Sequence, residues 1–180
     1  MRKLAVIVAG ALLAGCAGGP VLSNKTIVNP EAGSLVQDDL ADGAITLERH
    51  GNPFDVPGAV LDTGIATAAE GLTVPGLPPL ELEPGQGEQG LRLVAVFNPL
   101  TSASSSRACS HPGSLVGEPV SQVATALFAY CSGPFVETTV RGRVTGVSHP
   151  DDPRFRAMVR RSMHAMFNVR PEQIEDDWPD

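Results

Sequence analysis

Hydrophobic and polar positions alternate with a period of two along three stretches of the chain, which predicts β-strands there. Residues 44–49 place Ile45 and Leu47 on one face. Residues 91–97 are apolar on nearly both faces, as expected of a strand in the centre of a sheet. Residues 135–144 place mainly valines on one face, and threonine and charged side chains on the other. The alternation therefore predicts one strand over each of these ranges.

Apolar positions recur at helical spacing in two further stretches. Residues 57–70 carry apolar side chains every three or four positions, and Gly71 follows as a helix stop. Near the end of the chain, Asp152 is a typical helix cap and Pro153 a typical first helical residue. The apolar stripe of this last helix consists of Phe155, Met158, Val159, Met163, Met166 and Phe167. We expect the stripe to be buried against the sheet.

Residues 120–131 fit both periods, because their apolar side chains can be placed on a helical stripe or on one face of a strand. Only Ser132-Gly133-Pro134 separates this stretch from the strand at 135–144. So short a connection favours a β-hairpin. A helix over 120–131 is the alternative.

These elements predict an α+β fold: a small antiparallel sheet of about four strands, with two helices packed on one face. Residues 16–43 contain several Gly and Pro residues and no sustained periodicity, which predicts a flexible N-terminal tether. Residues 72–90, rich in Pro and Gly, are predicted to be a long surface loop. The folded part is expected to be a single α+β domain over 44–168, followed by an acidic C-terminal tail over 169–180.

Residues 1–15 have the layout of a secretory signal peptide. A basic start at Arg2 and Lys3 precedes an apolar run of ten residues, which is too short to cross a bilayer as a helix. The run ends in Leu13-Ala14-Gly15-Cys16, which resembles the lipobox of bacterial lipoproteins. The resemblance implies cleavage before Cys16, a diacylglycerol on its thiol, and an acyl group such as palmitate on its new amino group. The alternative is an ordinary signal peptide, with Cys16 incidental.

The resemblance also implies a location. In lipoproteins of Gram-negative bacteria, Asp after the cysteine tends to mean retention in the inner membrane, and this chain has Ala17 instead. We therefore expect a lipid anchor at the periplasmic face of the outer membrane, with retention in the inner membrane as the alternative. The expected partners are the membrane, through the N-terminal lipid, and another envelope protein.

The charge and the cysteines agree with an exported protein. The chain carries a formal net charge of −7, and cleavage before Cys16 would remove Arg2 and Lys3 and make it −9. An acidic chain without a basic cluster argues against nucleic-acid binding. The only other cysteines are Cys109 and Cys131, which in an oxidising compartment most simply form a disulfide. A metal-binding or redox pair is the alternative.

Motifs for catalysis or cofactor binding are sparse. The loop from Ser104 to His111 holds several serines beside an imidazole, which suggests a hydrolase, yet the Gly-x-Ser-x-Gly elbow is absent. The histidines lack the spacing of zinc ligands, and no phosphate-binding P-loop occurs. Residues 85–90 spell Gly-x-Gly-x-x-Gly, but they precede a strand instead of following one. We therefore expect no cofactor and no metal.

One surface remains as a candidate binding site. The last helix presents Arg154, Arg156, Arg160 and Arg161 opposite its apolar stripe. These side chains could bind anionic lipid or the carboxylates of a partner, or form an ordinary solvated face. The leading functional hypothesis is a non-enzymatic binding or assembly accessory anchored in the envelope. The alternatives are an envelope hydrolase using the Ser104–His111 loop, and a carrier of lipid or another hydrophobic ligand with a cavity between helices and sheet.

Overall fold

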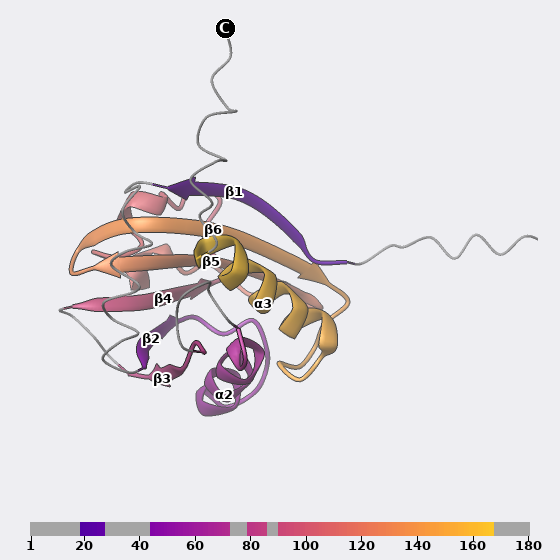
Figure 1. The fold of residues 1–180 in the computed structure, drawn as a ribbon. Helices are drawn as coiled ribbons and strands as arrows, with labels where there is room; N and C mark the ends of the chain where they lie inside the picture. Colours follow the sequence, from indigo (N-terminus) through magenta and orange to yellow (C-terminus); the bar gives the residue numbers. More distant parts are fainter. Residues whose placement is uncertain (1–18, 28–43, 73–78, 86–89, 168–180) are drawn as a thin grey trace, which may run out of the picture.

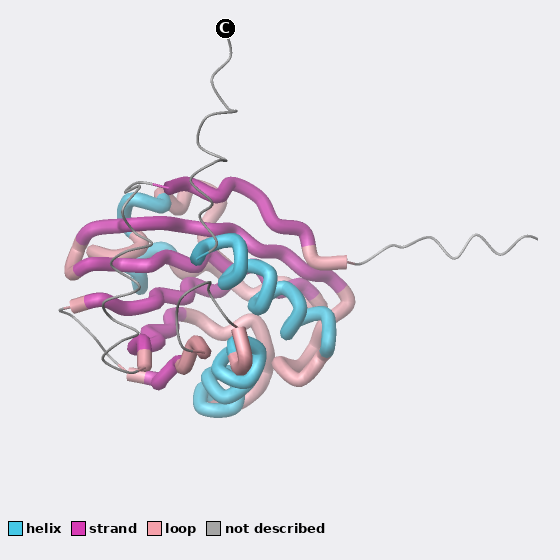
Figure 2. The backbone as a smooth tube through the Cα atoms, in the orientation of Figure 1, coloured by secondary structure: helices cyan, strands magenta, loops and turns pink. Residues whose placement is uncertain are grey.

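A computed structural model describes residues 19–27, 44–72, 79–85 and 90–167, which form two layers (Figure 1). In this part of the chain, six strands form one mixed sheet in the order β1-β6-β5-β4-β2-β3. Both helices lie on the same side of it, as Figures 1 and 2 show. The predicted α+β class, with two helices on one face, is confirmed. The strands are β1 Val21–Ile27, β2 Ile45–His50, β3 Leu82–Pro84, β4 Leu91–Phe97, β5 Val123–Ser132 and β6 Phe135–Thr145, and the helices are α2 Gly58–Ala69 and α3 Pro153–Phe167.

The prediction of a purely antiparallel sheet is wrong. β2 pairs in parallel with both β3 and β4. The other pairs are antiparallel: β4 with β5, β5 with β6, and β6 with β1. The reason is the helix between the strands. Because α2 carries the chain back along the sheet after β2, the next two strands, β3 and β4, run in the same direction as β2.

The prediction of about four strands is too low, because both edges of the sheet carry a strand that the hydrophobic pattern does not indicate. β1 lies in the segment predicted as a tether and pairs with β6, so the prediction of a continuous tether over 16–43 is wrong for residues 21–27. β3 lies in the predicted loop at 72–90. Edge strands bury little surface, so their sequences need no apolar face. The predicted signal peptide, Cys16 and the acidic tail lie outside the described residues.

The predicted hairpin and central strand are confirmed. Residues 120–131 contribute strand β5, which pairs with β6 across the short connection at 132–134. β4 lies between β5 and β2, and its side chains are buried from Arg92 to Phe97. The helix alternative for 120–131 is thereby excluded.

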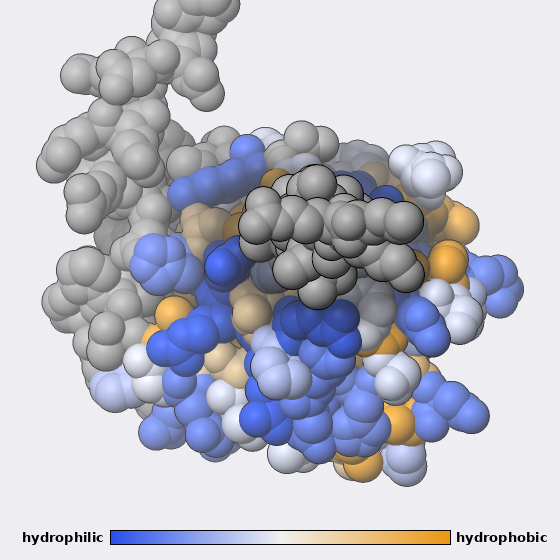
Figure 3. All heavy atoms as spheres, turned by 90° about the vertical axis from the view of Figure 1, so that its right-hand side faces the viewer, coloured by the Kyte–Doolittle hydropathy of each residue, from blue (hydrophilic) through white to orange (hydrophobic). Residues whose placement is uncertain are grey.

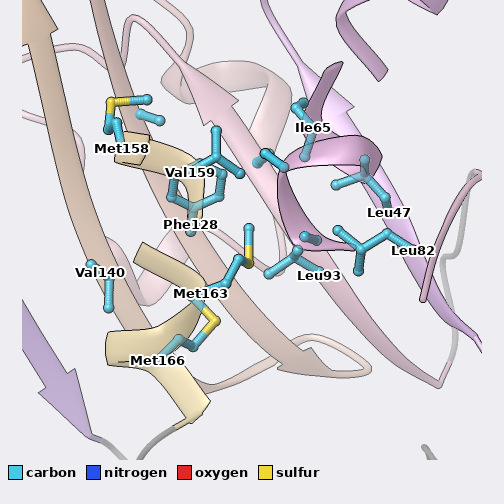
Figure 4. Packing of buried hydrophobic residues seen from close by; sticks show 14 of the residues in the cluster. Leu47, Ile65, Leu82, Leu93, Phe128, Val140, Met158, Val159, Met163 and Met166 are labelled. Carbon is cyan, nitrogen blue, oxygen red and sulfur yellow. The ribbon is translucent and has the colours of Figure 1, made fainter. Parts of the chain in front are cut away.

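The main core lies between the sheet and the two helices (Figure 4). α3 contributes its predicted stripe, in which Phe155, Val159, Met163 and Met166 are all buried. α2 adds Leu61 and Ile65, which are completely buried. Since the apolar stripe of α3 is satisfied inside the protein, this helix is a structural element of the domain.

Two glycines allow close approach between elements. A Cβ atom at Gly142 of β6 would lie 2.9 Å from Met158 Cγ and 2.9 Å from Ser162 Oγ of α3. A Cβ atom at Gly64 of α2 would lie 2.7 Å from the Cβ of Pro150, in the turn before α3. Gly64 therefore occupies a helical position, despite its low helix propensity, because another side chain would not fit there.

Candidate functional site

The face of the sheet opposite the helices is covered by the connection between β4 and β5. This connection, residues 98–122, contains two short 3-10 helices, η1 Ser105–Arg107 and η2 Pro112–Leu115. A second, smaller apolar cluster lies beneath it. The cluster consists of Val94, Val96, Ala103, Ala108, Cys109, Leu115, Leu127, Ala129, Cys131 and Val136. We call residues 101–117 the covering loop.

The covering loop is joined covalently to the sheet. Cys109 in the loop and Cys131 near the end of β5 form a disulfide, with their Cα atoms 5.6 Å apart. This separation is typical of disulfides. The predicted pairing of these cysteines is confirmed, and the bond holds the loop against the hairpin end of β5.

Arg92 joins the same parts by hydrogen bonds. The residue is only 4% exposed, although it lies in an otherwise apolar strand. Its Nε donates to Glu48 Oε2 at 2.7 Å, and its terminal nitrogens donate to the carbonyl oxygens of Gly133 and Cys109, each at 2.7 Å. Every partner of this buried guanidinium is thus an acceptor, as burial of a charge requires. Sequence reasoning missed Arg92, although a single arginine in a central strand was a usable signal.

Glu48 also binds His50. The other carboxylate oxygen of Glu48 lies 2.6 Å from His50 Nε2. Both residues lie on β2 two positions apart, so their side chains share one face of the sheet. The row His50–Glu48–Arg92 therefore leads from the half-buried imidazole to the buried guanidinium. It consists of the Arg92–Glu48 ion pair and a hydrogen bond between Glu48 and His50, and Arg92 fixes the covering loop and the hairpin turn.

A third contact holds the loop from the β6 side. Arg141 donates a hydrogen bond to the carbonyl oxygen of Ala103. The covering loop is consequently fixed at two points. β6 holds it at Ala103, and β4 and β5 hold it at Cys109. A loop held in this way loses little conformational entropy when something binds to it.

The residues of the predicted hydrolase loop are not brought together as a catalytic pair. Ser104 Oγ lies 2.7 Å from Ser106 Oγ, and His111 Nδ1 lies 3.0 Å from Ser110 Oγ. Within the described residues, no hydrogen bond joins Ser104 to His111. All four side chains are exposed on the outside of the loop.

Three of the four arginines of α3 bind different partners. Arg154 binds Asp152 and the carbonyl oxygen of Gly146, and Arg156 binds Asp151. Arg160 donates to the carbonyl oxygen of Glu70 at 3.0 Å. Arg160 and Arg161 line a shallow depression of about 290 Å³ together with Gly71, Leu72 and His164. Half of the predicted arginine surface thus serves the start of its own helix.

The cap of α3 has an electrostatic consequence. Asp152 Oδ1 accepts the backbone N–H of Arg154 at 2.9 Å, which confirms Asp152 as the cap. The side-chain hydrogen bond from Arg154 lowers the pKa of Asp152, and burial acts in the opposite direction to a smaller extent. The same ion pair raises the pKa of Arg154. In the part of the chain that is described, no group of three or more His, Cys, Asp and Glu side chains is placed to hold a metal ion.

The resemblance of this chain to known proteins is slight. No protein-family model matches it, and no curated protein sequence matches it. Among solved structures it is similar to a dodecamer of a PelC variant from Paraburkholderia phytofirmans, with 9% sequence identity and a TM-score of 0.40, over 83% of this chain and 97% of that chain. Among the helices of the described residues, none is long and apolar enough to cross a membrane.

Proposed function

We propose that the chain is an envelope lipoprotein, anchored by acyl chains on Cys16 at the periplasmic face of the outer membrane, whose domain serves as a non-enzymatic binding or assembly accessory. The anchoring rests on one observation, the Leu13-Ala14-Gly15-Cys16 sequence at the end of a ten-residue apolar run. The Cys109–Cys131 disulfide supports it, because structural disulfides persist in oxidising compartments. Two or more acyl chains give stable attachment, at about 0.8 kcal/mol per buried CH₂.

The surface near the proposed anchor agrees with attachment through lipid. β1 begins at Val21, five residues after Cys16. Figure 3 views the end of the molecule at which β1 begins, and the described residues visible there are mostly hydrophilic with small separate apolar areas. The apolar stripe of α3 is buried in the core. These features make the acyl chains on Cys16 the main attachment in the proposal.

The binding role is supported by the covering loop. A disulfide, Arg92 and Arg141 hold this surface loop in one conformation. A pre-organised surface loop is what a binding or assembly accessory would use.

The anchor is tested by labelling growing cells with an alkyne analogue of palmitate and by separating inner and outer membranes. Wild-type chain should be labelled and found in the outer membrane, and Cys16→Ser should be unlabelled and released from it. Ala17→Asp should stay labelled but move to the inner membrane, with Ala17→Ser as the matched control. Labelling of Cys16→Ser would overturn the anchor, and an unmoved Ala17→Asp would overturn the sorting step.

The binding role is tested by photo-crosslinking in intact cells. A photoreactive amino acid at the exposed Ser110 of the covering loop should give a discrete adduct. The same group at Glu70, at the exposed end of α2, is the control and should not give that adduct. Equal adducts at both positions, or none at Ser110, would contradict a binding role for the loop.

A further inference from the structure

An open cavity lies at the hairpin end of the sheet, beside the covering loop. It measures about 510 Å³ and lies between η1 and the start of β6. Its size falls in the range of about 300–1,000 Å³ that is usual for small-molecule sites. The lining residues are Thr26, Ser105, Ser106, Pro134, Phe135, Val136 and Glu137. Apolar walls thus surround a single carboxylate and three hydroxyl groups.

Glu137 is the unusual member of this lining. The residue is only 7% exposed. No hydrogen bond or ion pair joins its carboxylate to any other residue in the parts of the chain that are described. Its carboxylate oxygens are not among the fully buried atoms that lack a partner, so they keep contact with the open cavity. Glu137 lines the cavity, so a cation or a donor bound there can pair with this carboxylate.

A β-bulge explains why Glu137 lines the cavity. Tyr130 of β5 pairs with Thr138, but the next residue, Cys131, pairs with Val136. Glu137 is therefore an extra residue opposite β5. A bulge breaks the alternation of a strand and re-aims a side chain, and bulges are common beside functional sites. The irregularity in β6 is what allows Val136 and Glu137, neighbours in sequence, to line the same cavity.

The other lining groups indicate the kind of partner. The ring of Phe135 stands at the cavity and is 71% exposed, which is unusual for a phenylalanine. An aromatic face attracts cations, and hydroxyl oxygens accept N–H donors. The carboxylate of Glu137 would accept the strongest hydrogen bond from a positively charged donor. Pro134 and Val136 offer contact to an apolar group.

We propose that this cavity binds a primary ammonium group attached to a small apolar body. The ammonium donates to the Glu137 carboxylate and to the hydroxyls of Ser105 or Ser106, and the apolar body packs on Phe135. The negative net charge of the chain favours the approach of cations. The ammonium belongs to a free amine or to a lysine side chain of a partner protein.

The walls of the cavity are held in place before a ligand arrives. The Cys109–Cys131 disulfide links the covering loop, which carries Ser105 and Ser106, to the end of β5. Arg92 binds the carbonyl oxygens of Cys109 and of Gly133 in the hairpin turn. Both walls are therefore tied to the same buried side chains, which reduces the entropy lost on binding.

The test is isothermal titration of the full chain in nanodiscs of zwitterionic lipid, with empty nanodiscs as the blank. Benzylammonium is the probe, and benzyl alcohol and benzoate are its neutral and anionic counterparts. Benzylammonium should bind best, and Glu137→Gln should weaken it by about tenfold or more, while leaving benzyl alcohol unchanged. Glu83→Gln, an exposed glutamate on β3, is the matched control and should bind as wild type.

Phe135→Ala provides a variant whose folding is not in question, because the ring is mostly exposed. It should weaken benzylammonium by about threefold to tenfold through loss of the aromatic face. A blocked dipeptide with a lysine side chain, compared with its acetyl-lysine form, shows whether a protein-borne ammonium binds more tightly than the free amine. Equal binding of each charged probe and its neutral counterpart, or equal effects of Glu137→Gln and Glu83→Gln, would overturn the proposal.

Discussion

Arg92 illustrates how one side chain can determine the position of several segments. Its guanidinium lies in the middle of the sheet and donates to β2, to the covering loop and to the hairpin turn. These parts are far apart in the sequence, and Arg92 joins them beside the Cys109–Cys131 disulfide. The cost of burying the charge is offset by acceptors on every side.

Arg92→Met should therefore destabilise the fold by about 3 kcal/mol or more, because it leaves Glu48 without its cationic partner and two carbonyl oxygens without donors. The free energy of unfolding from urea titration measures this. Arg107→Met, on the exposed side of the covering loop, is the control and should change stability by about 0.5 kcal/mol at most. A similar loss in both variants would show that Arg92 does not have this role.

Asp152 allows a prediction of pH dependence. Its pKa in the folded protein lies below its ordinary value of 3.8, chiefly because of the hydrogen bond from Arg154. A lowered pKa means that the charged form stabilises the fold above the ordinary value, and that this contribution is lost as the pH falls through the folded-state pKa. Asp152→Asn should be less stable than wild type at pH 6, and the difference should shrink in acid. A difference independent of pH would contradict this.

At the scale of elements, α3 and β6 depend on a close approach. Gly142→Ala would place a Cβ atom 2.9 Å from both Met158 and Ser162, so the helix would have to move outward. We expect a loss of about 1–3 kcal/mol from this overpacking. Gly133→Ala in the hairpin turn is not a fair control, because Gly133 has a positive φ of 55°. Gly19→Ala, with nothing within 4 Å, is the proper control and should be neutral.

The covering loop is tied to the sheet by its disulfide, which closes a separation of 22 residues. Replacing both cysteines, Cys109→Ala with Cys131→Ala, should lower the free energy of unfolding by about 3 kcal/mol. Wild-type protein reduced with dithiothreitol should match the double variant. If reduction leaves the stability unchanged, the bond adds nothing to the fold.

The elements with a buried face could be predicted from the sequence, and those without one could not. α3 shows its stripe because burial selects apolar residues at helical spacing. β1 reads Val-Leu-Ser-Asn-Lys-Thr-Ile, which lacks the alternation of a half-buried strand, because an edge strand relies on backbone pairing with β6. The parallel pairing of β2 could also have been predicted, from the strand–helix–strand order.

The candidate sites, too, could be predicted from the sequence only in part. The cysteine pair could be predicted because it needed only a count of residues. Arg92 and Glu137 could not be assigned a role, because their significance depends on which backbone oxygens and bulges they meet in three dimensions. A charged residue in a strand shows that burial must be compensated, but the sequence does not name the partner.

At the scale of the whole molecule, aromatic rings connect the two layers. Phe155 of α3 lies 5.0 Å from Phe54 and 6.0 Å from Phe97 of β4, measured between ring centroids, and Phe97 lies 6.2 Å from Phe128 of β5. These contacts extend from the segment before α2, through α3, to the centre of the sheet. The rings therefore couple the helices to the strands.

Phe155→Ala should lower the free energy of unfolding by about 3–5 kcal/mol, because the cavity would open between all of these elements. Far-ultraviolet and near-ultraviolet circular dichroism should still report one common transition. Val60→Ala on the exposed side of α2 is the control and should be close to neutral. Two separate transitions in the wild type would show that the layers unfold independently.

The direction of β1 has a consequence for how the protein stands on a membrane. β1 pairs antiparallel with β6, so Val21 lies opposite Arg143 and Ile27 lies opposite Thr138, toward the hairpin turn. The five residues from Cys16 to Val21 span at most about 18 Å, and β1 itself extends for about 20 Å. An acylated Cys16 would therefore keep one end of the sheet beside the lipid headgroups. The cavity at Glu137 would then open at the far end, where solutes and partners of the compartment can reach it without competition from the bilayer.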